Sequence, residues 1–198
     1  MEMDDLRFTE IEHKFIVSDG FDLARFRQTL NELGPTRTNS VRVRDRYYLT
    51  AHGAARGFVL RHRLDAELQQ LTIKSLETDT EVRTEVNLDL GSHAGDQTAQ
   101  VESFVERLGL AWSGTIHKDV NVWYYPECEV VHYVAAAGSL RITCVEFEAT
   151  RKDSMQSALA TLDRFERATG FFGQPRSRVS LPQLLFPRFP QRRPASVE

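Results

Sequence analysis

The sequence predicts an α+β protein built around an antiparallel β-sheet, and three observations favour this class. Much of the chain alternates apolar and polar residues with a period of two, which is typical of half-buried strands. These segments follow one another directly or across one helical segment, whereas a parallel sheet needs strands and helices in strict alternation. Of the 198 residues, 41% are hydrophobic and 27% are charged, as in a soluble globular protein.

Eight segments are predicted to be strands because they are extended in pattern and bounded by turn-forming residues. They cover residues 6–17, 38–49, 57–65, 69–76, 82–90, 114–125, 128–136 and 140–150. Most are joined as hairpins or through one helix, which favours antiparallel neighbours.

Three segments repeat apolar residues at spacings of three and four, which predicts amphipathic helices. They cover residues 21–33, 97–109 and 153–170. Gly34 and Pro35 are predicted to end the first helix. Gly109 and Gly170 are the predicted C-terminal stops of the other two, and Asp153 is the predicted N-cap of the third.

Several classes of protein are excluded by this interpretation. Residues 1–8 are acidic and lack the apolar run of a signal peptide, and no stretch reaches the roughly 18 apolar residues of a membrane span. We therefore expect a cytoplasmic protein with no membrane partner. A net charge of −3 and the lack of interleaved aromatic and basic residues argue against nucleic acid as a partner. Cys128 and Cys144 have no metal-ligand spacing and are expected to be reduced structural thiols.

Charged residues recur at two-residue spacing on several predicted strands. Side chains two apart share a face of a strand, so Glu10, Glu12 and Lys14 form a charged stripe opposite the apolar Ile11 and Phe15. Further stripes are formed by Arg61 and Arg63, by Lys74, by Arg83 and Glu85, and by Glu146 and Glu148. Paired glutamates thus mark the first and last strands, and paired arginines mark a central one.

Two arrangements of the sheet accommodate these stripes. In the first, the charged face is a solvated outer face and the apolar faces meet in a core. In the second, the strands close into a barrel whose interior carries the charges, and the helices cover part of the apolar outside. The sorting of charges by sign favours the barrel, since solvated faces usually mix in small polar residues.

A barrel interior of this kind has a definite chemistry. Clustered carboxylates raise one another's pKa unless cations neutralise them. Glutamates without a Cys or His ligand set suit hard cations such as Mg²⁺ or Mn²⁺. Clustered Arg and Lys suit a ligand with several phosphate oxygens. The combination predicts a metal–phosphate site of the kind used in phosphoryl transfer.

The order of these motifs resembles the CYTH superfamily, also called the triphosphate tunnel metalloenzymes. Glu10-Ile-Glu12-His-Lys14 resembles its E-x-E-x-K signature, and DRYYLT at 45–50 resembles its D-x-Y-F-D-T segment. LRHR at 60–63, TIK at 72–74, RTEV at 83–86, HKD at 117–119 and EFE at 146–148 follow in the family's order. One E-x-E-x-K match is weak, whereas its combination with the six further motifs in order is specific, and the resemblance spans about residues 8–186.

The resemblance implies an eight-stranded antiparallel β-barrel, or tunnel, with a charged interior and flanking helices. Residues 1–186 would form this single domain, and the Pro- and Arg-rich residues 187–198 a flexible tail. The implied metal ligands are Glu10, Glu12, Glu146 and Glu148. The implied phosphate-binding residues are Lys14, Arg61, Arg63, Lys74, Arg83, Lys118 and Arg178, and the implied catalytic set is Glu10, Glu12, Lys14, Glu85 and Glu148.

The chain departs from the family pattern at several positions. Leu49 stands where the second acidic residue of D-x-Y-F-D-T is common, and Val120 where a second basic residue follows Lys118. His132 is the nearest match to an Asp metal ligand on the strand before EFE, and it is either a substitute ligand or a structural residue. Arg176 is the alternative to Arg178 in the closing basic segment.

The resemblance implies a divalent-metal-dependent hydrolase acting on a small-molecule triphosphate, with inorganic tripolyphosphate as the first expected substrate. Thiamine triphosphatase and class IV adenylyl cyclase activities are the enzymatic alternatives, and they require an aromatic partner for a ring. Trp112, Trp123, Tyr47 and Tyr48 are the candidates for that partner. The departures also leave open a module that binds polyphosphate or nucleotide without turnover, and a homodimer remains an open possibility.

Overall fold

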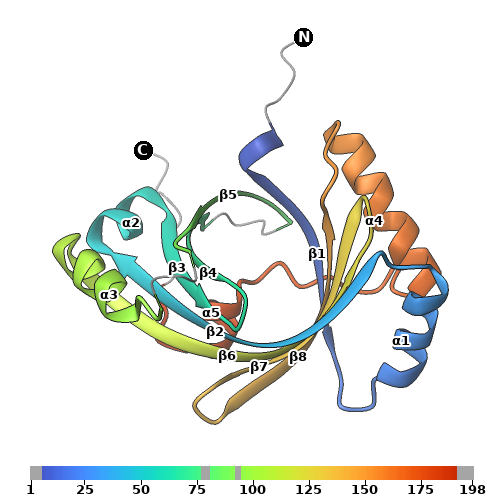
Figure 1. Ribbon diagram of the computed structural model, residues 1–198, viewed down its shortest axis with the longest axis horizontal. Coiled ribbons are helices and arrows are strands. Elements are labelled where there is room, and N and C mark those ends of the chain that lie inside the picture. Colours follow the sequence, from blue (N-terminus) through green and yellow to red (C-terminus); the bar gives the residue numbers. More distant parts are fainter. Residues whose placement is uncertain (1–5, 77–80, 92–94, 191–198) are drawn as a thin grey trace, which may run out of the picture.

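A computed structural model describes residues 6–76, 81–91 and 95–190. Within these residues, eight antiparallel strands close into a barrel in the order β1-β5-β4-β3-β2-β6-β7-β8 (Figure 1). The strands are β1 (Thr9–Val17), β2 (Arg37–Thr50), β3 (Phe58–Leu64), β4 (Gln69–Ser75), β5 (Val82–Asp89), β6 (Leu110–Tyr124), β7 (Cys128–Ala137) and β8 (Leu140–Ala149). The predicted α+β barrel with flanking helices is confirmed.

The helices flank the barrel at two places. Figure 1 shows α1 and α4 together beside β1 and β8, and α2 and α3 near the far end of β2. The helical elements are η1 (Leu6–Phe8), α1 (Leu23–Glu32), α2 (Ala51–Arg56), α3 (Thr98–Arg107), α4 (Met155–Thr169) and α5 (Leu181–Leu185). None of the described helices is long and apolar enough to cross a membrane.

The sequence did not predict the two shortest α-helices, α2 and α5. Helices of five or six residues are too short to show a periodicity of 3.6. The start of α2 is fixed by Thr50, whose side chain accepts a hydrogen bond from the Gly53 backbone N–H at 2.9 Å. Its end is fixed by Gly57, which has a left-handed φ of 77°.

Three predicted boundaries were wrong. Residues 6–8, predicted as the start of the first strand, form the 3-10 helix η1, and β1 begins at Thr9. The N-cap of α4 is Ser154 rather than Asp153, because Ser154 and Ser157 exchange side-chain to backbone hydrogen bonds in a capping box. Strand β6 begins at Leu110, four residues before the prediction, and continues through Gly114. A Cβ at Gly114 would lie 2.7 Å from the Phe186 ring, so glycine there allows close packing inside a strand.

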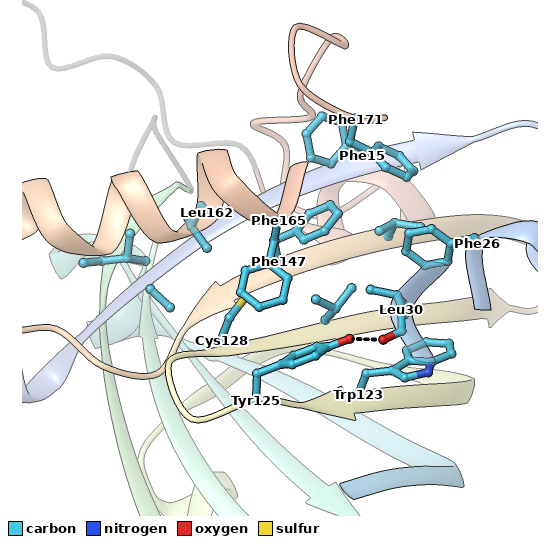
Figure 2. Packing of buried hydrophobic residues seen from close by; sticks show 14 of the residues in the cluster. Phe15, Phe26, Leu30, Trp123, Tyr125, Cys128, Phe147, Leu162, Phe165 and Phe171 are labelled. Carbon is cyan, nitrogen blue, oxygen red and sulfur yellow. Dashed lines mark hydrogen bonds between the residues drawn. The ribbon is translucent and has the colours of Figure 1, made fainter. Parts of the chain in front are cut away.

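The apolar stripes of β1, β7 and β8 face outward and are covered by α1 and α4. Figure 2 shows the resulting cluster, in which Phe15 and Phe147 lie near Phe165 and Phe171. The Tyr125 hydroxyl donates a hydrogen bond to the Leu30 carbonyl at 2.7 Å and ties α1 to the sheet. The sheet is therefore inverted, with its apolar core outside the barrel and its charges inside. Both cysteines are free and buried, as expected.

Helix α5 lies at one end of the barrel. Its Leu181 and Leu185 pack in a cluster with the interior-facing Tyr47, Val59 and Ile116. This apolar cluster fills that end of the interior. The packed part of the chain continues past the predicted domain end at 186, because Phe189 is buried against Trp112. Residues 191–198 of the predicted tail lie outside the described residues.

Candidate functional site

The interior of the barrel holds a cavity of about 440 Å³ lined by charged side chains. Because side chains alternate along a strand, Glu10, Glu12 and Lys14 face this cavity while Ile11 and Phe15 lie in the outer core. The other predicted site residues that line the cavity are Arg61, Arg63, Lys74, Arg83, Glu85, Lys118, Glu146 and Glu148. The charged stripes thus meet inside the barrel, as the second arrangement of the sheet predicted.

Arg178 does not line the cavity. Its side chain is 59% exposed, and its guanidinium lies 3.1 Å from Glu81. Arg176, the alternative, contacts the buried Glu166 at 3.1 Å on the outside of the barrel. Neither arginine of the closing segment joins the interior cluster in this structure. Nearby residues of the same segment, Ser180 and Leu181, do line the cavity.

Glu10 is held by two basic side chains on neighbouring strands. The Lys74 ammonium donates to it at 3.0 Å, and the Arg83 guanidinium also donates to it. Burial acts to raise the pKa of Glu10, but the charges of Lys74 and Arg83 outweigh burial and hold this pKa well below its usual value. Glu10 is therefore ionised and fully compensated.

A second group joins β1, β7 and β8. The Lys14 ammonium lies 3.7 Å from both Glu12 and Glu146. The Tyr133 hydroxyl donates a hydrogen bond to Glu146 at 2.6 Å. Burial acts to raise the pKa of Glu146, but Lys14 and Lys118 lower it below the usual value. Glu146 is thus ionised and oriented by three neighbouring side chains.

Asp45 on β2 organises two predicted phosphate-binding residues. Its carboxylate accepts two hydrogen bonds from Arg63, both at 2.8 Å, and lies 2.8 Å from the Lys118 ammonium. Asp45 is fully buried. Burial acts to raise its pKa, but Arg63 and Lys118 hold it well below the usual range. DRYYLT was recognised as a motif, yet no role was predicted for Asp45, whose partners come from β3 and β6.

Glu148 differs from these carboxylates because it has no hydrogen-bond or ion-pair partner within the described part of the chain. It lies opposite Glu12 in the register of β1 and β8. Burial, followed by the charges of Glu10 and Glu12, raises the pKa of Glu148 to about 8. Burial is also the main reason that the pKa of Glu12 rises to about 7. The cavity therefore contains carboxylates whose ionisation is penalised by burial more than the protein's own cations favour it.

Glu129 on β7 is a cavity residue that the sequence analysis missed. It pairs with Glu148 in the register of β7 and β8 and faces the interior. Burial raises its pKa. Alternation along β7 could have found it, since the neighbouring Cys128 and Val130 are apolar and lie in the outer core.

His132 is not a substitute ligand in the cavity, and that alternative was wrong. Its position on β7 turns it outward, where its ring stacks on Phe21 with centroids 6.0 Å apart. The one-residue offset from Val131 and Tyr133, which do line the cavity, places it on the opposite face. The structural alternative for this histidine is the one observed.

The cavity carboxylates fit a hard divalent cation. Glu12, Glu129 and Glu148 carry carboxylate oxygens on adjacent strands, and Glu148 has a raised pKa and no ion-pair partner within the described residues. A divalent cation would neutralise the charge that burial penalises.

Outside the cavity, His13, Asp163 and Glu166 bring their potential metal-ligand atoms within 4.8 Å of one another. Arg176 already lies 3.1 Å from Glu166 and 3.5 Å from Asp163 and supplies the positive charge there. We therefore read this group as an ion network joining β1, α4 and the closing segment.

Leu49 and Val120, which differ from the family pattern, lie in different surroundings. Leu49 is fully buried and does not line the cavity, so it removes no charge from the interior wall. Val120 does line the cavity and places an apolar surface two residues from Lys118. Its cross-strand partners are Val41 on β2 and Tyr133 on β7.

Comparison with known proteins agrees with this architecture. A family model described as the CYTH domain matches residues 9–171. No curated protein matches the chain. Among solved structures, the PH1012 protein from Pyrococcus horikoshii OT3 has a TM-score of 0.68 at 16% identity, covering 89% of this chain and 99% of its own. A conserved hypothetical protein from Pyrococcus furiosus has a TM-score of 0.65 at 24% identity, with the same coverage.

One further structure has a described activity. It is a Hippeastrum protein, a putative adenylyl cyclase with a dominant triphosphatase activity, with a TM-score of 0.52 at 15% identity, covering 87% of this chain and 90% of its own. At these identities the solved structures show a shared fold. The family model covers most of the chain, and its match agrees with the charged barrel interior. This chain belongs to the CYTH domain family.

Proposed function

We propose that this protein is a divalent-metal-dependent hydrolase of triphosphate compounds, for which inorganic tripolyphosphate is the smallest substrate. The observation that carries the proposal is the composition of one cavity. Its wall combines basic side chains with carboxylates, and among the latter Glu148 has no partner within the described residues. A site for an anion alone would gain nothing from the buried Glu12, Glu146 and Glu148.

The basic residues are arranged to hold a phosphate chain. Lys14, Arg61 and Lys74 approach the cavity from three different strands, and each is almost completely buried. Each also contacts a glutamate, as Lys74 contacts Glu10 and Glu85. Phosphate oxygens compete for the same donors because charge-assisted hydrogen bonds to phosphate resemble those to carboxylate. Substrate binding would thus release carboxylates from their ion pairs.

Released carboxylates become available as ligands for Mg²⁺ or Mn²⁺. Glu10, Glu12, Glu146 and Glu148 would hold the cation, and Glu129 adds a carboxylate beside them. When bound, the cation would neutralise charge on the phosphate chain and orient it. Glu85 lies 3.4 Å from Arg61 and also contacts Lys74, so we assign it to positioning these two basic residues.

The reaction proposed is hydrolysis of the terminal phosphoanhydride bond. A water oxygen adds to the terminal phosphorus, and the bond from that phosphorus to its bridging oxygen breaks. The products are orthophosphate and the diphosphate compound, with one proton released to solvent near neutral pH. The residues of the chain contribute by positioning and by charge, which supply most of the catalysis in phosphoryl transfer.

The positions of the aromatic candidates support ring-containing substrates less than they support tripolyphosphate. Of the four aromatic candidates, Trp123 and Tyr48 pack in the outer clusters, and Trp112 packs against Phe186. Tyr47 lines the cavity but belongs to the apolar cluster at the α5 end. Thiamine triphosphate hydrolysis and ATP cyclisation therefore lack a ring partner among these four. The binding-module alternative is disfavoured by the uncompensated Glu148.

The test is phosphate release from tripolyphosphate, ATP and thiamine triphosphate with Mg²⁺, with Mn²⁺ and with EDTA. We expect metal-dependent release from the wild type and a loss of at least about 10²-fold in Glu148→Gln, as expected for a lost ligand worth several kcal/mol. Glu106→Gln on the exposed face of α3 is the matched control and keeps full activity. Tight tripolyphosphate binding without release would instead support the binding module.

A further inference from the structure

Part of the cavity wall is lined by a group of valines. The valine wall, as we call it, faces the cavity from three neighbouring strands. Its members are Val41 and Val43 on β2, Val120 and Val122 on β6, and Val131 on β7. Leu68, from the turn between β3 and β4, adds a further apolar side chain to the lining. In a barrel whose interior is otherwise rich in charge, such a surface needs an explanation.

The valine wall is more than the edge of the apolar cluster at α5. Val120 and Val131 do pack against that cluster. Val41, Val43 and Val122 do not belong to it, and they continue the apolar surface away from α5. The wall therefore runs from the plugged end of the barrel along the open part of the cavity.

The valine wall directly adjoins the phosphate-binding residues. Val43 is the cross-strand partner of Lys118, and Val131 is the partner of Glu146. Val120 pairs with Tyr133, which holds Glu146. A phosphate chain held by the basic residues would thus have its next substituent within reach of the wall. The cavity of about 440 Å³ falls in the size range of sites for small organic ligands, about 300–1,000 Å³.

Valine side chains favour apolar substituents on the phosphate chain over polar ones, because they cannot form hydrogen bonds. They offer neither donors nor acceptors, so phosphate oxygens placed against Val41, Val120 and Val122 would lose water without a replacement. The polar edge of a nucleobase would suffer the same loss. An aliphatic group loses nothing there and gains from leaving water.

We propose that the preferred substrate is a triphosphate monoester of a small aliphatic alcohol, with its alkyl group on the valine wall and its phosphate chain among the basic residues. This inference rests on the proposed hydrolase function and narrows its substrate class. Hydrolysis of such a compound yields orthophosphate and the alkyl diphosphate, with no other reactant than water.

The test compares n-pentyl triphosphate, tripolyphosphate and ATP, by kcat/KM with Mg²⁺ and by calorimetric affinity. We expect n-pentyl triphosphate to exceed both others by about 10-fold or more, since a single methylene in an apolar pocket is worth at least that. The variants Val120→Thr and Val131→Thr keep the side-chain volume and add a hydroxyl. Combined, they should reduce this preference about 10-fold.

Val134→Thr is the matched control, because Val134 lies on β7 but does not line the cavity. This variant should prefer n-pentyl triphosphate as strongly as the wild type does. Equal or tighter binding of tripolyphosphate or ATP by the wild type would overturn the inference, and so would a preference that survives the double variant. Tighter binding of n-pentyl triphosphate without release of phosphate from any compound would keep the inference about the wall and defeat the hydrolase proposal.

Discussion

Two buried carboxylates at the barrel interior, Asp45 on β2 and Glu148 on β8, have opposite surroundings. Asp45 is enclosed by Arg63 and Lys118, and its pKa lies well below the usual range despite burial. Glu148 faces Glu10 and Glu12, and its pKa is raised to about 8 by burial and by these charges. Burial is common to both, so the neighbouring charges decide the difference. Asp45 therefore has its counter-ions within the protein, whereas Glu148 has no ion-pair partner among the described residues.

Removing the charge of Asp45 gives the largest expected effect. In Asp45→Asn, Arg63 and Lys118 lose their counter-ion inside the barrel, and breaking a buried pair costs about 3–5 kcal/mol in the free energy of unfolding. Urea unfolding measures this loss. The control is Asp96→Asn, since Asp96 pairs with Arg44 at 2.9 Å but is half exposed, and its loss should stay below about 1 kcal/mol. Similar losses of stability in Asp45→Asn and Asp96→Asn would show that the buried ion pairs of Asp45 matter no more than the exposed pair of Asp96.

A divalent cation should stabilise the protein through the carboxylates around Glu148. At pH 8, Mg²⁺ at about 100 times its dissociation constant adds roughly 2.7 kcal/mol, which corresponds to a rise in Tm of about 5–10 °C for a chain of this size. Differential scanning fluorimetry measures the shift with Mg²⁺ against EDTA. Glu148→Gln should lose most of it and Asp45→Asn should retain it. An undiminished shift in Glu148→Gln would place the cation elsewhere.

The stability of the metal-free protein should fall as the pH rises from about 5 to 8. The pKa of Glu148 is about 8 in the folded state against about 4.5 when exposed, so the folded state binds the proton more tightly. Folding is favoured where both states are protonated, and this advantage is lost as pH rises through the folded pKa. Glu12, with a pKa of about 7, acts in the same direction. We expect a fall on the order of 2 kcal/mol in EDTA, measured by urea unfolding at each pH.

The smallest expected effect is a gain in stability from Glu148→Gln. A neutral amide does not suffer repulsion from Glu10 and Glu12, so at pH 9 without metal the variant should be on the order of 1 kcal/mol more stable than the wild type. At pH 5 the two should be equal, because Glu148 is then protonated. A variant less stable than the wild type at pH 9 would show that Glu148 is compensated after all. Asp45→Asn should instead be less stable than the wild type at every pH above 5.

The sequence alone determined the fold and most of the charged interior. Alternation with a period of two sets which side chains share a face, and it placed Glu10, Glu12 and Lys14 together without any knowledge of the barrel. The order of the charged stripes along the chain then identified the family. Helices long enough to show a 3.6-residue period were also predictable, whereas α2 and α5 were not.

Only the tertiary structure decided which charges are compensated and which wall is apolar. Asp45 meets Arg63 and Lys118 from two other strands, while the charges of Glu10 and Glu12 act on Glu148 more strongly than that of Lys74, and neither environment is local in sequence. Glu129 rather than His132 faces the cavity because a shift of one residue reverses the face of a strand. The valines of β2, β6 and β7 form one surface only because β6 pairs with β2 on one side and with β7 on the other. Alternation acts within a strand and is written in the sequence, whereas pairing between strands depends on the register of the closed barrel.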